Sequence, residues 1–445
     1  MVTLSVENGG PLAPMGRGIA AVRELGLRIV SAALQILATV AVVQALVPAV
    51  AGIYFRGAII AYGLAALLRG KYDLFVAQHF VDLRKSDLEQ HARAVVRGLG
   101  IRVLIRSAVA CAVLLVFTTD LDVMDVYLRP YLQTYLPFVL AVPFATLALF
   151  LASALRAVDH TIGSVMVSSY SINVLIIVAA SVTVAIKPDA PLLVVSWGFF
   201  LGCVLAAAVG VLLTRQVFAP PAKNSAEPRL NSAEWQEIYA SAARNGTAGV
   251  ALAALQWGPA CVLAVFGSAL EIAQYAVAIR TSHIIDFLIP AVVFVPRSAR
   301  IQSRLCQAMH SARGKLAVDL SVSLATTTVC VVAVGILTPL LFVNWYGPAY
   351  QDITGLFVLL FLMQWVAGVC RPALRQLAAD WDLRRVHRIM FVSMLGAITV
   401  ALAGVNEFGP LAAAVAGLVG ALLLNGQALD SAFRLAATPR TSVQP

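Results

Sequence analysis

The apolar stretch 271–297 holds three ionisable side chains near its middle, Arg280, His283 and Asp286. A charged group at mid-bilayer costs about 2.5–3.5 kcal/mol for Arg on insertion scales, so it needs a partner, a water-filled cavity or a function. Arg280 and His283 lie one turn apart on a helix, and Asp286 lies next to His283. Arg280 could pair internally with Asp286 or Glu271. We favour a local His283–Asp286 pair, which leaves Arg280 to contact an anion in the protein interior.

A polar stripe marks the first apolar segment, and its members are Arg28, Ser31, Gln35 and Thr39. Their spacing places all of these side chains on one helix face. The stripe could line a cavity, or it could hydrogen-bond to neighbouring helices. Arg28 could also extend to the membrane interface. We predict that Arg28 and Gln35 line a cavity.

The second apolar segment carries Arg56 on one stripe with Gly52, Gly63 and Gly70. Small residues beside an arginine leave room for water, a ligand or a closely packed partner helix. Arg56 is also close enough to the outer end of its segment to extend into the interface. We predict a cavity role for Arg56 and keep a close helix crossing as the alternative.

Arg244, Gln256 and His283 complete the predicted cavity residues. The predicted interior therefore holds more arginine than carboxylate. Arginine suits bidentate recognition of phosphate groups, whereas an exporter of cations would need interior Asp or Glu. The residue types thus indicate an anionic, phosphate-bearing substrate.

The composition places these residues in a membrane protein. Of the 445 residues, 60% are hydrophobic and 12% are charged, against about 25% charged in soluble domains. The net charge of +10 lies mainly in the predicted loops, where it orients helices, so we expect no nucleic-acid partner. The cysteines and histidines show no metal-ligand spacing. We predict no metal site, no disulfide and no cofactor.

About twelve segments are long and apolar enough to cross a bilayer. We predict them at 25–46, 51–69, 97–118, 131–155, 162–186, 191–214, 239–266, 271–296, 316–343, 353–376, 386–405 and 410–433. Most of the 32 Lys and Arg residues fall on one side of this arrangement. By the positive-inside rule, both termini are expected in the cytoplasm.

The most polar internal stretch divides the predicted helices into equal halves. We expect a cytoplasmic tail at 1–21, an N-terminal six-helix lobe at 22–214, a linker at 215–236, a C-terminal six-helix lobe at 237–435 and a tail at 436–445. In each half, the second helix has a tyrosine followed by an arginine within two turns. Two such halves would be related by an axis along the membrane normal.

Short motifs follow one another along the two halves: Gly52-Ile53-Tyr54, Ala154-Leu155-Arg156-Ala157, Gln274-Tyr275-Ala276-Val277-Ala278-Ile279-Arg280 and Trp345-Tyr346-Gly347-Pro348-Ala349-Tyr350. Asn173 follows the second motif and Pro296 follows the third. Their order resembles that of the multidrug/oligosaccharidyl-lipid/polysaccharide (MOP) flippase superfamily, in its polysaccharide-transport (Wzx-type) branch. The resemblance covers about residues 22–435.

The resemblance implies an all-α integral membrane protein, with two six-helix bundles around a V-shaped cationic cavity. It implies a flippase that moves an undecaprenyl-diphosphate-linked oligosaccharide across the bacterial inner membrane, for exopolysaccharide, capsule or O-antigen assembly. The expected partners are this lipid-linked substrate, the bilayer, and polysaccharide polymerase and chain-length machinery. Arg280 matches an arginine of the related lipid II flippases, so its role can be carried over.

Two departures from these relatives are visible. The lipid II flippases have more spans than this chain. Where related transporters carry an aspartate in span 7, this chain reads Gln256-Trp257-Gly258-Pro259. A proton- or sodium-coupling site is therefore in doubt at this place.

Two other functions fit the composition. A multidrug or small-molecule antiporter of the same superfamily would be favoured by interior carboxylates, which are scarce. A membrane-embedded glycosyltransferase or polymerase would need a long external catalytic loop, and the longest predicted external loop is short. We therefore predict a transporter rather than an enzyme.

Overall fold

The computed structural model describes the chain in segments that are mainly helical. These are residues 14–85, 89–119, 125–158, 160–218, 231–297, 312–341, 345–351, 353–379 and 383–437. Within these ranges no strand is present. Most of the predicted linker lies outside the described residues.

The first half contains the helices α1 (Pro14–Ala45), α2 (Pro48–Lys85), α3 (Glu89–Thr119), α4 (Asp125–Ala157), α5 (Thr161–Val165), η2 (Met166–Tyr170), α6 (Ser171–Ile186) and α7 (Pro191–Val217). Proline begins α2 and α7, because its fixed φ suits the first turn and no N–H is lost there. Lys187 ends α6 in the left-handed conformation, with φ of 50°.

The second half contains α8 (Ser232–Phe266), α9 (Ala269–Arg297), α11 (Ala312–Leu341), η4 (Pro348–Tyr350), α12 (Thr354–Val369), α13 (Arg371–Ala379), α14 (Leu383–Phe408) and α15 (Pro410–Ala437). Gly409 has a φ of 51° and turns the chain between α14 and α15. This positive φ favours glycine, which has no Cβ.

Within the described residues, the predicted membrane segments fall mainly on helices. Among the described residues, 10 helices contain a stretch that is long and apolar enough to cross a bilayer. The predicted segments 271–296 and 353–376 correspond to α9 and to α12 with α13. The prediction of an all-α integral membrane protein is confirmed.

Two predicted segments are not continuous α-helices. The segment 162–186 contains the π-helix η2 between α5 and α6, and π-helical turns are rare and frequent at functional sites. The segment 353–376 breaks at Cys370, directly before Arg371-Pro372. In a continuous helix Pro372 would have no N–H to donate to the Gly368 carbonyl, and its ring would clash with that carbonyl, which accounts for this break.

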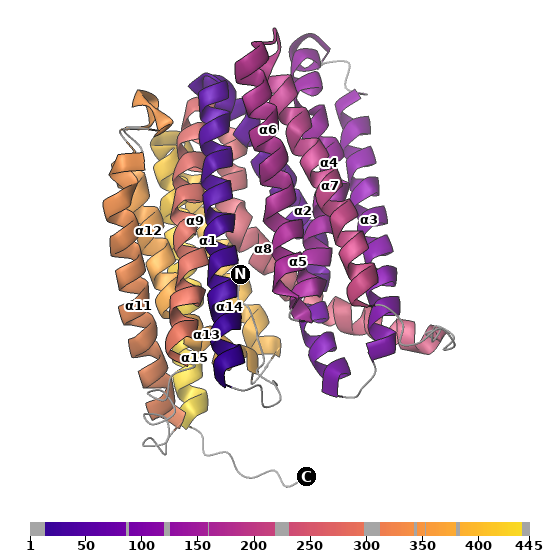
Figure 1. Ribbon diagram of the computed structural model, residues 1–445, viewed down its shortest axis with the longest axis vertical. Helices are drawn as coiled ribbons and strands as arrows, with labels where there is room; N and C mark the ends of the chain where they lie inside the picture. Colours follow the sequence, from indigo (N-terminus) through magenta and orange to yellow (C-terminus); the bar gives the residue numbers. More distant parts are fainter. Residues whose placement is uncertain are drawn as a thin grey trace.

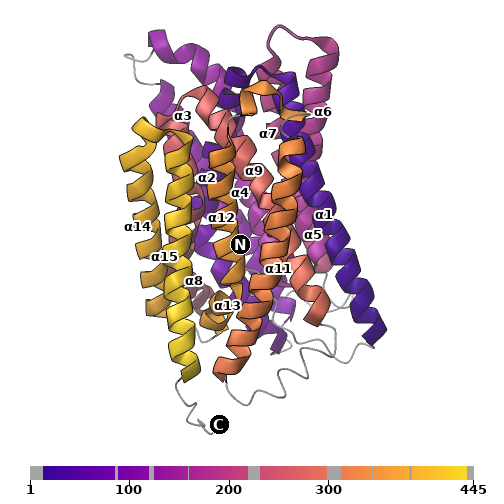
Figure 2. The same cartoon turned by 90° about the vertical axis from the view of Figure 1, so that its left-hand side faces the viewer.

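The two halves form groups of helices that lie side by side (Figure 1). They meet where α2 packs against α8 and α9, and where α1 packs against α9. We call this contact zone the junction. The start of α1 and the end of α15 lie at the same end of the molecule in both views (Figure 2), as an even number of crossings requires.

The beginning of α8 packs against the first half before the helix enters its apolar stretch Gly246–Phe266. Asn231 and Glu234 form a capping box that begins this helix. The Trp235 ring stacks on Tyr239, with centroids 5.3 Å apart, and Arg102 of α3 lies 3.4 Å from the centroid of the Tyr239 ring. The first turns of α8 therefore tie the second half to one end of the first.

Candidate functional site

Arg280 lies on α9 where this helix packs against α2. Its Cζ atom is 5.3 Å from the centroid of the Phe55 ring, within the range of cation–π contacts. Phe55 is fully buried, whereas Arg280 is half-buried. Among the side chains that the structure describes, no carboxylate or hydrogen-bond acceptor contacts Arg280. Arg280 therefore offers a positive charge at the junction.

Two tyrosines lie near this charge. Tyr54 packs against Phe55, with ring centroids 5.4 Å apart. The Tyr346 hydroxyl is within 3.5 Å of the hydroxyl of Thr281, which follows Arg280 in the chain. The buried Tyr54 hydroxyl has no hydrogen-bond partner among the described residues. The site thus combines one guanidinium with aromatic rings and a phenol hydroxyl that is available for a further bond.

The segment that precedes α12 holds α9 in position. Gln274 Nε2 donates to the Ala349 carbonyl at 3.2 Å, and the Thr281 hydroxyl lies 3.5 Å from the Tyr346 hydroxyl. Gly347 makes the turn between these contacts with a φ of 85°. The motif that contains Gln274 and Arg280 is therefore in contact with the motif that contains Tyr346 and Ala349.

Tyr62 of α2 and Trp257 of α8 are in contact across the junction. Their rings stack with centroids 5.7 Å apart and an interplanar angle of 20°. Phe199 of α7 packs edge-on behind Tyr62, at 5.4 Å and 84°. Both stacked residues are half-buried.

Gln256, a predicted cavity residue, is exposed near the middle of the apolar stretch of α8. It adjoins Trp257 in the chain, and it stays a candidate for the cavity.

Arg56 binds the second half directly. Its Nη2 donates to the Gly267 carbonyl at 2.6 Å, just after the end of α8, and its buried Nε has no partner among the described residues. Glu271 caps the start of α9 through the backbone N–H of Ser268, at 2.7 Å. Arg56 thus closes one end of the junction through the backbone.

The glycines on the Arg56 stripe allow α2 to approach the second half closely. A Cβ on Gly63 would lie 2.5 Å from Cys261 Sγ, and one on Gly70 would lie 2.8 Å from the Gly249 carbonyl oxygen. A Cβ on Gly52 would overlap the backbone of Ala269. For these glycines the structure supports the alternative of a close helix crossing.

The polar stripe of α1 mostly serves packing. Ser31 Oγ donates to Ser169 Oγ at 2.9 Å, and the Thr39 hydroxyl bonds the Gln35 carbonyl at 2.8 Å. The side chain of Gln35 is half-buried and has no hydrogen bond with a described residue. Gln35 stays a candidate for the cavity, as does the half-buried Arg28.

The remaining predicted residues, Arg244 and His283, belong to α8 and α9. Arg244 is exposed and precedes the apolar stretch of α8, which begins at Gly246. His283 is half-buried one turn after Arg280 on α9. Asp286 belongs to α9, but its side chain lies outside the described residues, so its pairing with His283 stays a prediction.

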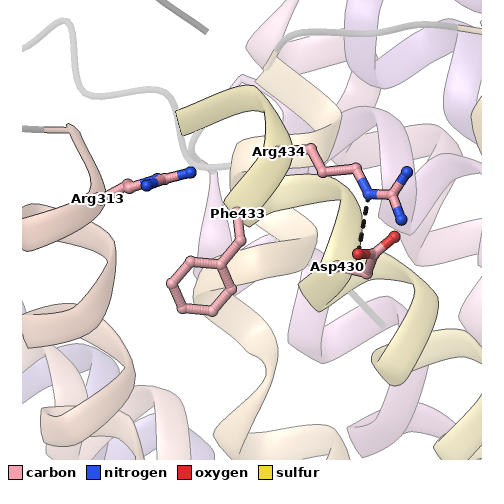
Figure 3. Close-up of a pocket in the computed structure, with 4 residues that line it drawn as sticks. All are labelled: Arg313, Asp430, Phe433 and Arg434. Carbon is pink, nitrogen blue, oxygen red and sulfur yellow. Dashed lines mark hydrogen bonds and ion pairs between the residues drawn. The ribbon is translucent and has the colours of Figure 1, made fainter. Parts of the chain in front are cut away.

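A groove of about 490 Å³ lies between the start of α11 and the end of α15 (Figure 3). Its lining residues are Arg313, Asp430, Phe433 and Arg434. Arg434 Nε donates to Asp430 Oδ1 at 2.9 Å. Arg313 extends toward the groove from α11 and is exposed, which makes it a useful comparison for Arg280.

Sequence reasoning did not select the aromatic residues of the site. Phe55, Tyr62 and Trp257 are apolar or amphipathic types that ordinarily pack in a core. The one available signal was the departure at Gln256-Trp257-Gly258-Pro259, the stretch in which related transporters carry an aspartate. Their gathering around Arg280 depends on contacts between helices that are distant in the chain.

Comparisons with known proteins find structures of similar fold but no protein of similar sequence. No protein-family model matches the chain, and no curated protein matches its sequence. The lipid II flippase MurJ in an inward closed conformation has a TM-score of 0.63 at 13% identity, covering 94% of this chain and 87% of that one. A mutant of the Vibrio cholerae MATE transporter VcmN has a TM-score of 0.58 at 14% identity, covering 95% and 97%.

A third solved structure is a MOP superfamily transporter from Pyrococcus furiosus, with a TM-score of 0.54 at 13% identity, covering 94% and 95% of the two chains. All three similarities extend over nearly the whole chain. The protein therefore has the fold of MOP-superfamily transporters, as predicted. The matches do not distinguish the polysaccharide branch from the others, so that assignment stays a prediction.

Proposed function

We propose that this protein is a flippase for an undecaprenyl-diphosphate-linked oligosaccharide, which it moves from the cytoplasmic to the outer leaflet of the bacterial inner membrane. The observation that supports this proposal best is Arg280. It is half-buried at the junction, beside the Phe55 ring, and no described side chain neutralises its charge. A diphosphate would supply the missing negative charge.

The chemistry of Arg280 favours a phosphate-bearing lipid over an organic cation. A guanidinium presents paired N–H donors that match two phosphate oxygens. A cationic drug would instead be repelled by the same charge, and the repulsion is stronger away from bulk water. An antiporter for cations is therefore the weaker candidate, although MATE transporters share the fold.

Alternating access would proceed at the junction. Gly70 and Gly249 bring α2 and α8 together toward one end, and the bond from Arg56 to Gly267 joins the halves at the other end. We expect these contacts to break in turn as the halves rock, which would open the Arg280 site to each leaflet. The end near Arg56 would face outward, because most basic loops lie at the opposite end.

Outward movement of a diphosphate is aided by an inside-negative membrane potential, by about 2.3 kcal/mol per charge per 100 mV. The translocated lipid would then be available to a polysaccharide polymerase and its chain-length machinery for exopolysaccharide, capsule or O-antigen assembly. These partners are proposed from the substrate class.

The test is translocation by the purified protein in vesicles. One arm supplies undecaprenyl-diphosphate-linked oligosaccharides that contain different glycans, and a second arm measures export of a cationic dye. We expect protein-dependent translocation of a lipid-linked oligosaccharide and no dye export. Dye export without lipid translocation would overturn the proposal in favour of an antiporter.

A further inference from the structure

We infer that the stacked pair Tyr62–Trp257 is the glycan-contacting subsite of the transport site, where Trp257 packs against the first sugar while Arg280 holds the diphosphate. This inference rests on the proposed function and names the part of the substrate that each residue recognises. Arg280, Tyr62 and Trp257 come from α9, α2 and α8, which meet at the junction.

Contacts on α2 relate the three residues. Arg280 lies over Phe55, and Tyr62 follows Phe55 by seven residues, which places both on the same face of α2. Tyr62 stacks on Trp257 with centroids 5.7 Å apart. Phe199, which belongs to the first half, packs against Tyr62 with an interplanar angle of 84°. Trp257 belongs to the second half. The indole plane is therefore fixed by Tyr62, which is itself fixed by the core of the first half.

The pair faces inward rather than toward lipid. Ile60 is 40% exposed on α2, and two residues of helix place Tyr62 about 200° away from it. Because Ile60 suits the lipid-facing side, Tyr62 lies on the inner face, as does Phe55 beneath Arg280. Gln256 is exposed and adjoins Trp257 in the chain. The inner surface therefore offers an aromatic plane, and an amide is next to it in the sequence.

These groups suit a sugar next to a diphosphate. The C–H bonds of a pyranose carry small positive charges, and the face of an aromatic ring is negative. The half-buried indole of Trp257 can therefore pack against a sugar, while the Gln256 amide can donate to and accept from hydroxyl groups. Neither interaction is available to a diphosphate that lacks sugar.

The experiment measures binding of two probes to purified protein in nanodiscs. The probes are undecaprenyl diphosphate and undecaprenyl-diphosphate-linked N-acetylglucosamine. Trp257→Leu removes the aromatic face and keeps an apolar side chain, while Trp257→Phe keeps a smaller ring. The matched control is Trp365→Leu, because Trp365 is also half-buried but donates to Thr328 of α11 at 2.9 Å, away from the junction.

We expect Trp257→Leu to raise the Kd of the glycosylated probe about three- to tenfold and to leave the Kd of the sugar-free probe unchanged. Trp257→Phe should be intermediate, and Trp365→Leu should match the wild type. An equal change for both probes, or no change, would overturn the subsite while the proposed function stands. If the wild type binds neither probe, the proposed function fails and the subsite fails with it.

Discussion

The guanidinium of Arg280, from the second half of the protein, lies over the ring of Phe55, from the first half, with 5.3 Å between Cζ and the ring centroid. A movement of one half against the other therefore changes the surroundings of this charge. The fully buried Phe55 ring packs edge-on against Tyr54, with centroids 5.4 Å apart. Phe55 is thus a fixed surface against which Arg280 is oriented.

Replacement of Phe55 by leucine should weaken transport without unfolding the protein. Leucine keeps an apolar side chain but lacks the ring face, whose attraction for a cation is worth about 0.5–2 kcal/mol. We expect translocation to fall about two- to thirtyfold, as measured by the initial rate in vesicles. A rate equal to that of the wild type would show that the ring does not position Arg280.

Gly249→Ala should separate the two halves at one end. Its new Cβ would overlap the backbone carbonyl of Gly70, and overpacking of this kind costs about 1–3 kcal/mol. We expect a lower melting temperature in detergent. The control is Gly335→Ala, whose Cβ would lie 3.8 Å from Phe361 in ordinary contact. Equal melting temperatures for the two variants would contradict the close crossing of α2 and α8.

Arg56→Ala should reduce stability more than substrate binding. It removes the bond to the Gly267 carbonyl, and a hydrogen bond from a charged group contributes about 1.5–3 kcal/mol. Denaturant unfolding measures this loss, and the Kd for undecaprenyl diphosphate should change little. Arg56 would instead be a ligand contact if the variant kept its stability and lost affinity.

Ser31→Ala and Gln35→Ala should separate the two roles of the α1 stripe. Ser31 bonds Ser169, so its loss should lower stability by about 1 kcal/mol. Gln35 has no hydrogen bond with a described residue, so its replacement should leave stability unchanged and reduce transport if Gln35 lines the cavity. Thermal unfolding and the vesicle assay check both effects. A stability loss for Gln35→Ala would indicate packing instead.

The helices could be predicted from the sequence, because long apolar runs and their proline and glycine boundaries are local signals. The π-helix Met166–Tyr170 lies inside a segment predicted as one membrane span, where hydrophobicity alone shows no boundary. The position of Arg280 in an apolar helix also indicated an interior charge. The role of Arg280 as an anion contact stays a prediction.

The partners of the site could not be predicted in the same way. The Gly267 carbonyl that Arg56 binds is 211 residues away in the chain, so no helical spacing relates the two. The stripe of Gly52, Gly63 and Gly70 fitted a cavity and a close crossing equally, until the backbone of the second half was placed against it. Tyr62 and Trp257 gain a role only through their mutual stacking.

The central claim is tested most directly by the initial rate at which Arg280→Ala translocates undecaprenyl-diphosphate-linked oligosaccharide in vesicles. Arg313→Ala is the matched control, because Arg313 is exposed beside a groove away from the junction. We predict a rate at least about tenfold lower for Arg280→Ala, which corresponds to about 1.4 kcal/mol, and a wild-type rate for Arg313→Ala. Equal rates for the two variants would contradict the role of Arg280 as the anion contact.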